Sequence, residues 1–424
     1  MKMKILKKRF LFLGLLLLIL IYAAGTSLIL SGCGGGGSSP FSTPAPNNTT
    51  STPAVTGYNN VMYVYLDDYA DEDAPDIPYV YVYINGGSTP IPLLLDTGAT
   101  GILINKSALT AAGVNIASTS NSFSVVFGDS TKASGYVNNL DVYTAASGGG
   151  TAAYNIPVAI ATSDTAFISS GFLQGDFGMG LSPCSSFGQS DGSIYTPSFS
   201  SAVSDNNYNN GFIINFRNIT FTNGYTIINN PQNNPVGTIT LGLNTESDNA
   251  LSAQSEFYPN SLACQEQFPM LASLFGGYTS DSTGYAFYSF FDTGSNFIFL
   301  GTEALDDSIG SGASTNDVIT SGLCSSFVYG GLTVNFSLLN SNESYYPNSF
   351  ITEPDNGPNN SFCDYQDAIN AMSTTDKDAL AFKYAVYYVG SKQGQEDFGT
   401  SFMFGNILFW QAQTANQTWG VGVE

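Results

Sequence analysis

The sequence repeats one short pattern, in which an apolar strand runs directly into Asp-Thr-Gly and a second apolar strand follows. Residues 93–104 read Leu-Leu-Leu-Asp-Thr-Gly-Ala-Thr-Gly-Ile-Leu-Ile, and residues 289–300 read Ser-Phe-Phe-Asp-Thr-Gly-Ser-Asn-Phe-Ile-Phe-Leu. A single Asp-Thr-Gly is a common turn. Two copies in similar apolar frames, 292 − 96 = 196 positions apart, indicate a chain built from two related halves.

The two aspartates of this pattern, Asp96 and Asp292, are the candidate catalytic residues. Each ends a buried strand, where glycine allows a tight turn and backbone N–H groups can bond the carboxylate. Two such turns facing each other across a pseudo-two-fold axis would bring the carboxyls to about 3 Å, where they share one proton. One carboxyl can then accept a proton from water while the other protonates a carbonyl oxygen, which is general acid–base hydrolysis.

The charge composition excludes most other chemistry. The 424 residues contain no His, 33 Asp+Glu and 11 Lys+Arg, and five of the basic residues lie in the first nine positions. The chain beyond residue 32 therefore carries 6 − 33 = −27, which disfavours nucleic-acid binding. Without His there is no Ser-His-Asp or Cys-His catalysis and no imidazole metal site. A total of only 10% charged residues fits either an acid-exposed protein or an ordinary extracellular surface.

The first 57 residues predict export and a membrane tether. Residues 1–32 have a basic start, an apolar stretch and Leu-Ser-Gly before Cys33, and they look like a bacterial lipoprotein signal peptide. This resemblance implies a lipidated, palmitate-bearing Cys33 as the first mature residue, and Gly34 after it resembles outer-membrane sorting in a Gram-negative host. Residues 33–57 form a flexible Gly-, Ser-, Thr- and Pro-rich tether. The alternative is an uncleaved transmembrane anchor, since the apolar stretch is long enough.

Four further cysteines are an even number, as expected in an oxidising compartment. They permit three pairings, of which we favour Cys324–Cys363, the shorter closure, and this leaves Cys184 to pair with Cys264. Their spacing indicates no metal site. The acidic stretch at 67–76 lacks the glycine-centred ligand spacing of a calcium loop, so we interpret it as a solvated loop and expect no metal or other cofactor.

The body of the chain predicts a mostly β fold with a few short helices. The expected strands are 79–84 and 92–95 around an Asn-Gly turn, the hairpin 122–127 with 136–143, and 156–161, 238–243, 285–291 and 401–409. The expected helices are 107–112 and 365–372. We place an N-terminal lobe at 58–210 and a C-terminal lobe at 211–424, each with one Asp-Thr-Gly.

The doubled motif resembles the pepsin-like aspartic peptidases, and more closely an uncharacterised bacterial family of secreted relatives, over residues 58–412. The resemblance implies an all-β, bilobal pepsin-like fold with Asp96 and Asp292 as the catalytic pair. It also implies that the catalytic loops are supported by residues following each aspartate: Thr97, Gly98, Thr293, Gly294 and Ser295. The segments 177–181 and 402–406 resemble the apolar-apolar-Gly strands that cross behind the two loops. Cys324 and Cys363 lie about where pepsins carry a second-lobe disulfide, and 237–243 resembles a second-lobe strand of the bacterial family.

The sequence departs from the pepsin pattern at three places. Pepsins have Ser or Thr three residues after each aspartate, where Ser295 fits and Ala99 does not. The hairpin at 122–137 takes the place of the flap, but Phe127, followed by Gly128 and Asp129, stands where pepsins carry the flap tyrosine. Residues 34–57 contain no Lys or Arg, so they offer no basic prosegment to cover the site.

Two functions follow from these observations. The first is a monomeric, lipid-anchored aspartic endopeptidase that cleaves polypeptide between its lobes and works best in acid. The alternative is a catalytically inactive pepsin-like surface lipoprotein that binds peptide or glycan in the same cleft. Coplanar carboxyls of Asp96 and Asp292 at hydrogen-bond distance would favour the first function, and a wider separation would favour the second.

Overall fold

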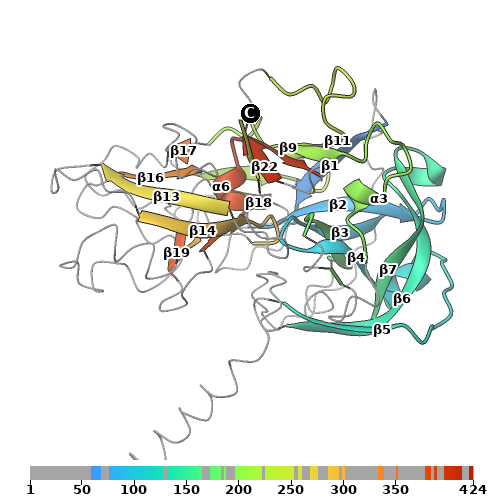
Figure 1. Ribbon diagram of the computed structural model, residues 1–424. Coiled ribbons are helices and arrows are strands. Elements are labelled where there is room, and N and C mark those ends of the chain that lie inside the picture. The colour runs from blue at the N-terminus through green and yellow to red at the C-terminus, as the bar shows by residue number, and fades with distance from the viewer. Residues whose placement is uncertain are drawn as a thin grey trace, which may run out of the picture. The chain divides into compact units, whose positions relative to one another are not determined.

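The described part of the chain is built mainly from β-strands (Figure 1). The computed structural model describes residues 59–67, 76–127, 131–164, 172–182, 186–187, 196–221, 225–252, 256–259, 268–275, 285–295, 298–300, 333–338, 350–351, 378–382, 386–388, 396–412 and 420–423. The predicted signal peptide and tether, all five cysteines and the predicted helix at 365–372 lie outside these residues. No helix among the described segments is long and apolar enough to span a bilayer.

The larger sheet has 13 strands among the described residues, and it contains the first Asp-Thr-Gly. Its order is β12 (Glu256–Pro259), β22 (Gly420–Val423), β21 (Ile407–Gln411), β9 (Gly211–Asn215), β11 (Gly237–Leu241), β1 (Val61–Leu66), β2 (Pro78–Ile84), β3 (Ile91–Asp96), β8 (Gly175–Met179), β4 (Thr100–Asn105), β7 (Ala152–Asp164), β6 (Lys132–Tyr143) and β5 (Ser122–Val126). Strand β6 also pairs with β2, so β2, β3, β8, β4, β7 and β6 form a closed ring of pairings. This ring fixes the position of Asp96.

The second sheet contains the strand that leads into Asp292. Its order is β17 (Phe350–Ile351), β16 (Thr333–Leu338), β13 (Phe268–Phe275), β14 (Tyr285–Phe291), β20 (Glu396–Phe398), β15 (Ile298–Leu300) and β19 (Val386–Tyr388). A separate pair joins β10 (Tyr225–Asn229) to β18 (Asp378–Phe382). The short helices are α2 (Lys106–Ala111), the 3-10 turn η1 (Ala146–Gly148), α3 (Phe199–Ala202) and α6 (Thr400–Met403).

The two sheets repeat one pattern of strand pairing around their Asp-Thr-Gly turns. In the first, β2 pairs antiparallel with β3, β3 parallel with β8, β8 antiparallel with β4, and β4 parallel with β7. In the second, β13, β14, β20, β15 and β19 follow the same sequence of antiparallel and parallel pairings. The predicted all-β fold with internal pseudo-two-fold symmetry is therefore confirmed.

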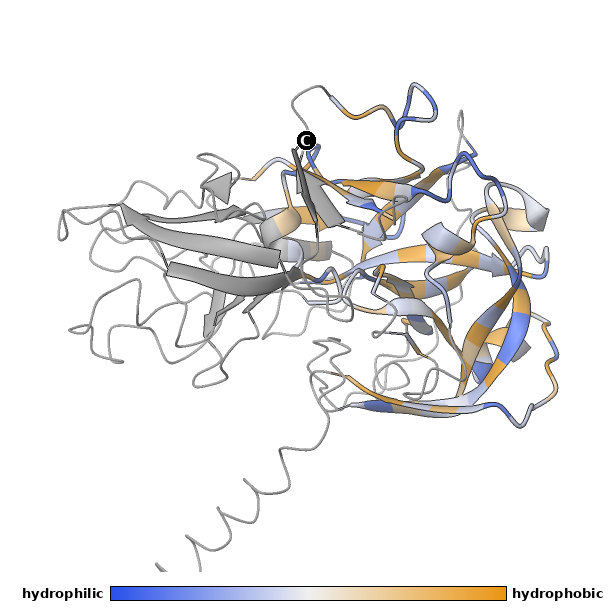
Figure 2. Cartoon of the chain, viewed as in Figure 1, coloured by the Kyte–Doolittle hydropathy of each residue, from blue (hydrophilic) through white to orange (hydrophobic). Residues whose placement is uncertain are grey.

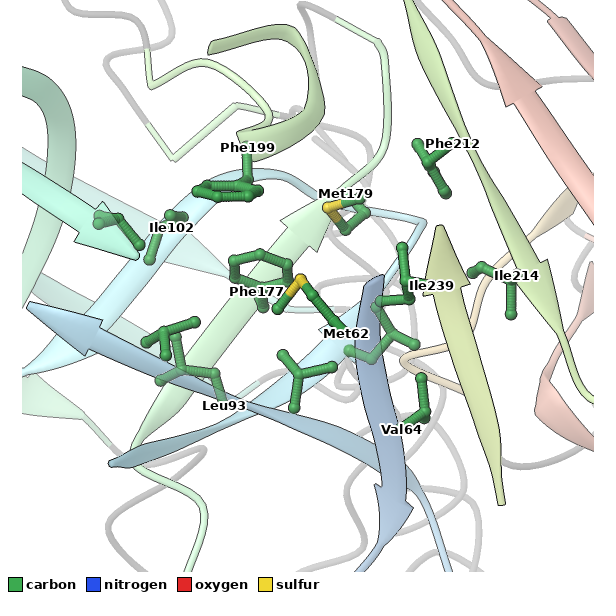
Figure 3. Packing of buried hydrophobic residues seen from close by; sticks show 14 of the residues in the cluster. Met62, Val64, Leu93, Ile102, Phe177, Met179, Phe199, Phe212, Ile214 and Ile239 are labelled. Carbon is green, nitrogen blue, oxygen red and sulfur yellow. The ribbon is translucent and has the colours of Figure 1, made fainter. Parts of the chain in front are cut away.

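The strand before the first turn is buried on both faces, as its unbroken apolar sequence predicts. Leu93 and Leu95 belong to one buried cluster, whereas Leu94 points to the opposite face and belongs to another. Figure 3 shows the first cluster, where Leu93 and Phe177 lie among side chains of neighbouring strands. Hydrophobic colouring follows the strands in Figure 2, while the turns between them are more hydrophilic. Burial on both faces holds the end of β3 in place.

The predicted hairpin at 79–95 is confirmed. Asn85 and Gly86 both have positive φ, at 51° and 71°, and the Gly87 N–H donates to the carbonyl of Ile84 to close the turn. The predicted strands at 122–127, 156–161 and 285–291 and the helix at 107–112 also correspond to described elements, with β6 and β7 longer than predicted. The strand predicted at 238–243 is β11, and it pairs with β1. The lobe boundary near residue 210 stays a prediction.

The strand predicted at 401–409 is wrong in its first half. Residues Thr400–Met403 form the short helix α6, and only Ile407–Gln411 extend as β21. The helical turn is closed by the Phe404 N–H, which donates to the Thr400 carbonyl, and Gly405 then reverses the chain with a φ of 81°. Apolar composition alone predicted a strand here, but the tertiary contacts of Thr400 favour a turn.

Candidate active site

The first Asp-Thr-Gly turn holds Asp96 at the end of β3 through two backbone hydrogen bonds. The Gly98 and Ala99 N–H groups donate to Asp96 Oδ1, at 2.7 and 2.8 Å. Asp96 is completely buried. Asp96 Oδ1 therefore accepts two hydrogen bonds. Oδ2 accepts no hydrogen bond from an N–H or hydroxyl group in the described part of the chain.

The second turn holds Asp292 in a related but different way. The Gly294 N–H donates to Asp292 Oδ1 at 2.7 Å, and the Ser295 hydroxyl donates to Oδ2 at 3.0 Å. Asp292 is also completely buried. Ser295 thus supplies the outer-oxygen donor that the sequence predicts, and Ala99 has no hydroxyl to do so in the first turn.

The two turns are joined by a reciprocal set of hydrogen bonds between their threonines. The Thr97 hydroxyl donates to the Phe291 carbonyl at 2.6 Å, and the Thr293 hydroxyl donates to the Leu95 carbonyl at 2.7 Å. Each hydroxyl also accepts the other threonine's backbone N–H, at 3.0 Å in both directions. These four bonds fix the two aspartates relative to each other, as the sequence predicts for Thr97 and Thr293.

Each glycine of the two turns lies against the opposite carboxyl. A Cβ on Gly98 would sit 2.7 Å from Cγ of Asp292, and a Cβ on Gly294 would sit 2.8 Å from Cγ of Asp96. No side chain fits in either place, so glycine is what lets the turns approach so closely. The two turns therefore bring the carboxyls of Asp96 and Asp292 close together.

Protonation of the pair follows from burial and from charge. Burial raises the pKa of Asp96 well above its ordinary value, and the nearby carboxylate of Asp176 raises it further. Burial likewise raises the pKa of Asp292, followed by the charge of Asp96. Since neither carboxyl can ionise easily beside the other, the pair is set up to retain a shared proton.

A strand crosses directly behind the first turn, as predicted. Strand β8 runs parallel to β3, with Phe177 opposite Leu95 and Gly178 opposite Asp96. On its other side it pairs antiparallel with β4, which leaves the turn. The predicted segment 177–181 therefore includes this crossing strand.

The crossing strand of the second turn is not the predicted segment 402–406. Strand β20 takes this place, because it runs parallel to β14 with Phe398 opposite Phe291. The predicted segment lies instead in α6 and the turn after it. A repeat that sequence reasoning missed would have located the strand: Asp176-Phe-Gly in β8 recurs as Asp397-Phe-Gly at the end of β20.

Two buried threonines that sequence reasoning also missed support the turns from behind. The Thr100 hydroxyl lies within hydrogen-bonding distance of the carbonyls of Gly180 and Ser182, at 2.9 and 2.6 Å. The Thr400 hydroxyl lies similarly close to the carbonyls of Thr293 and Ser295, at 3.0 and 3.1 Å. Thr400 directly follows the second Asp-Phe-Gly, which is the signal that could have identified it.

The flap candidate is a β-hairpin formed by β5 and β6. The Phe127 N–H donates to the Thr131 carbonyl at 2.9 Å, which continues the pairing toward the tip. The Phe127 side chain is buried in the same cluster as Ala99, with its ring centroid 6.2 Å from that of Phe187. Gly128 and Asp129 lie outside the described residues. The hairpin is thus linked by packing to the residue that follows the first turn.

Other predicted site residues lie beyond the described segments. Cys33, Cys184, Cys264, Cys324 and Cys363 are among them, so lipidation and disulfide pairing stay predictions. Most of the acidic stretch at 67–76 also lies outside, although Asp67 Oδ1 accepts the Ile77 N–H at 3.1 Å. Among the residues that are described, no three metal-ligating side chains gather in one place.

Comparisons with known proteins agree with this geometry. Residues 80–179, which include the first turn and β8, match the family model described as "Aspartyl protease". The structure is similar to the crystal structure of the aspartic proteinase from Irpex lacteus, with a TM-score of 0.55 and 14% sequence identity. The match covers 86% of this chain and 96% of the fungal one. A search of curated proteins gave no match.

The fold and the paired turns define an all-β protein with a pepsin-like, two-aspartate site. The family match is confined to residues 80–179, and the similarity to the fungal proteinase shows that the chain has a pepsin-like fold.

Proposed function

We propose that the protein is an aspartic endopeptidase that uses Asp96 and Asp292 to hydrolyse peptide bonds in polypeptides. The observation that carries this proposal is the arrangement of the two carboxyls. Both are completely buried, each is held by N–H groups of its own turn, and each lies against the glycine of the opposite turn. Two buried carboxyls, each placed against the opposite turn, are what the peptidase hypothesis requires and what a purely architectural role does not.

The chemistry needs only the shared proton and a water molecule. The ionised carboxyl takes a proton from water as the water oxygen attacks the peptide carbonyl carbon, and the protonated carboxyl gives its proton to the carbonyl oxygen. The C–N bond then breaks as the first carboxyl gives the proton it took from water to the amine nitrogen, while the second carboxyl regains a proton from a hydroxyl of the tetrahedral intermediate. The Ser295 hydroxyl stabilises negative charge on Asp292 Oδ2 during these steps. Neither step needs histidine, of which the chain has none.

The activity is expected to favour acid. One carboxyl must be protonated and the other ionised, and this state is lost when the pair gives up its shared proton at higher pH. The few charged residues of the chain agree with work in acid, since protonated carboxylates stop repelling each other.

The test is cleavage of an unfolded protein substrate by the full-length protein in detergent, between about pH 3 and pH 6. Activity should disappear in the double variant Asp96→Asn/Asp292→Asn and persist in Asp205→Asn, which removes an exposed carboxylate elsewhere. A statine-type transition-state analogue should bind the parent and block cleavage. Equal activity in the parent protein and the double variant would contradict the proposal.

A second candidate, an inactive peptide- or glycan-binding protein, draws support from Ala99 and Phe127. Asp96 Oδ2 lacks the hydroxyl donor found at Asp292, and the flap position carries no phenol. Peptide binding without any cleavage, unchanged in the double variant, would favour this candidate.

We further propose that the protein acts as a monomer attached to the cell envelope through lipid on Cys33, on the outer membrane. The support is the sequence of the first 57 residues. Labelled palmitate should enter the parent and not Cys33→Ser, and Cys33→Ser should leave the membrane fraction. A variant that stays unlabelled but remains in the membrane would favour the transmembrane alternative.

A further inference from the structure

A third carboxyl lies beside the catalytic pair, on the strand that crosses behind the first turn. Asp176 belongs to β8 and stands opposite Leu94 of the parallel strand β3. Partners in a parallel pair share a face of the sheet, and Leu94 shares its face with Asp96 two residues later. Strand register alone therefore directs the carboxyls of Asp176 and Asp96 to the same side.

Side-chain geometry agrees with this placement. Asp176 and Asp96 are both completely buried on adjacent strands, and the Asp176 carboxylate is close enough to raise the pKa of Asp96. Two neighbouring buried carboxyls cannot both ionise without large repulsion, so their protonation is coupled. The site thus contains three coupled carboxyls in a row, with Asp96 between Asp176 and Asp292.

The titratable groups that face Asp96 come from three of the four elements around it. Strand β8 contributes Asp176, and the second turn contributes Asp292. Strand β2, on the far side of β3, contributes the phenol of Tyr79, whose hydroxyl lies 3.3 Å from that of Tyr81. Strand β4 is Thr-Gly-Ile-Leu-Ile-Asn and contains no titratable side chain. Among the described residues, the charge that raises the pKa of Asp96 is therefore the negative charge of Asp176.

Resting on the proposed peptidase function, we propose that Asp176 is a positioning residue whose carboxylate keeps the catalytic pair protonated and so extends activity toward neutral pH. It acts through Asp96 and does not touch the reacting atoms itself. The direction follows from its charge, because a neighbouring carboxylate raises the pKa of Asp96.

The repeated Asp-Phe-Gly sequence is a second observation that supports this role for Asp176. The Asp-Phe-Gly of β8 recurs in β20, where Asp397 stands opposite Phe290, two positions before Asp292. An acidic residue thus occupies the equivalent register position beside both catalytic aspartates. Fold architecture alone would call for an apolar residue in a buried strand of this kind, since an isolated buried charge is costly.

The test is the pH profile of kcat/KM for the full-length protein and for Asp176→Asn and Asp176→Leu. The basic limb should move to lower pH by about one unit or more in both variants, because removing one carboxylate makes the pair easier to ionise. Asp205→Asn, which removes one exposed charge, should leave the limb in place. A residue that only fills space would lower the rate or the stability without moving the limb.

An infrared titration of protonated carboxyls separates failure of this proposal from failure of the peptidase function. The parent should retain a carboxyl proton well above the ordinary range, and Asp176→Asn should release it at lower pH, whether or not either protein cleaves. An unmoved titration in the variants, or a parent in which no carboxyl proton persists, overturns the proposal. An unmoved limb with selective loss of cleavage beside Lys or Arg would also overturn it, and would make Asp176 a substrate contact.

Discussion

The two Asp-Thr-Gly turns have the same architecture and different electrostatics. The four hydrogen bonds of Thr97 and Thr293 that join the turns, here called the threonine interlock, are reciprocal. The two N–H to hydroxyl distances are both 3.0 Å, and the two hydroxyl to carbonyl distances are 2.6 and 2.7 Å. The hydrogen-bond donors to the two carboxylates differ between the turns. Asp292 Oδ2 accepts from the Ser295 hydroxyl, whereas Asp96 Oδ1 accepts from two N–H groups and Asp96 Oδ2, among the described residues, from none. The position of the pair is therefore a symmetric property, and its protonation is an asymmetric one.

The largest expected effect is on catalysis and should be symmetric. Asp96→Asn and Asp292→Asn should each lower kcat/KM by about 10²–10⁴-fold, since each removes one partner of the acid–base pair. Circular dichroism should show that both variants remain folded. If one variant kept most of the parent activity, the two turns would not form one catalytic unit.

The next effect concerns stability and tests the interlock. Thr97→Val and Thr293→Val should each lower the free energy of unfolding by about 2 kcal/mol or more, because each leaves a buried carbonyl and a buried N–H without a hydrogen-bond partner. Denaturant unfolding measures the loss, and the two values should agree closely. Thr110→Val is the control, since Thr110 bonds the Lys106 carbonyl on an exposed helix and should cost little. A large difference between the two site variants would break the symmetry.

A smaller effect is the dependence of stability on pH. Burial raises the pKa of both Asp96 and Asp292 in the folded state, and the charge of Asp176 on Asp96 and of Asp96 on Asp292 raises them further. The folded protein therefore binds more protons than the unfolded chain above the ordinary carboxyl range. The stability that these protons contribute is complete below the unfolded-state pKa and is lost as pH rises toward the folded-state pKa. In that window each extra bound proton lowers the free energy of unfolding by about 1.4 kcal/mol for every pH unit of increase. Unfolding measured across pH should show this decline, and Asp96→Asn/Asp292→Asn should flatten it. A decline of equal size in the double variant would assign it to other groups.

The smallest effect is expected from a substitution that gives both turns the same hydroxyl donor. Ala99→Ser introduces the hydroxyl that Ser295 provides in the second turn, and a donor to the ionised carboxylate lowers the pKa of Asp96. The basic limb of the pH profile should then move to lower pH by about half a unit. Ser295→Ala should move it in the opposite direction. Shifts of the same sign in both variants would contradict the role given to the outer-oxygen donor.

Local sequence pattern predicted the parts of the site that depend on local structure. The apolar strands that end in Asp96 and Asp292, and the Asn85 turn before the first, follow from periodicity and turn chemistry. The crossing strand behind the second turn was missed because Asp397 interrupts its apolar pattern, while 402–406 matches that pattern better. Asp176 was missed for the same reason, and Thr400 acts only through carbonyls more than a hundred residues away. Comparison of the two halves, position by position, would have recovered all three.

The bonds between the turns also determine when the site can exist. The Thr293 hydroxyl reaches the carbonyl of Leu95 across 198 positions, and Thr400 then contacts Thr293 across a further 107. Contacts of such long range form late in folding, and a chain is synthesised from its N-terminus. A growing chain therefore has no assembled carboxyl pair until nearly all of it has been made. On the proposed function, an incomplete chain would therefore lack the carboxyl pair that peptide hydrolysis requires.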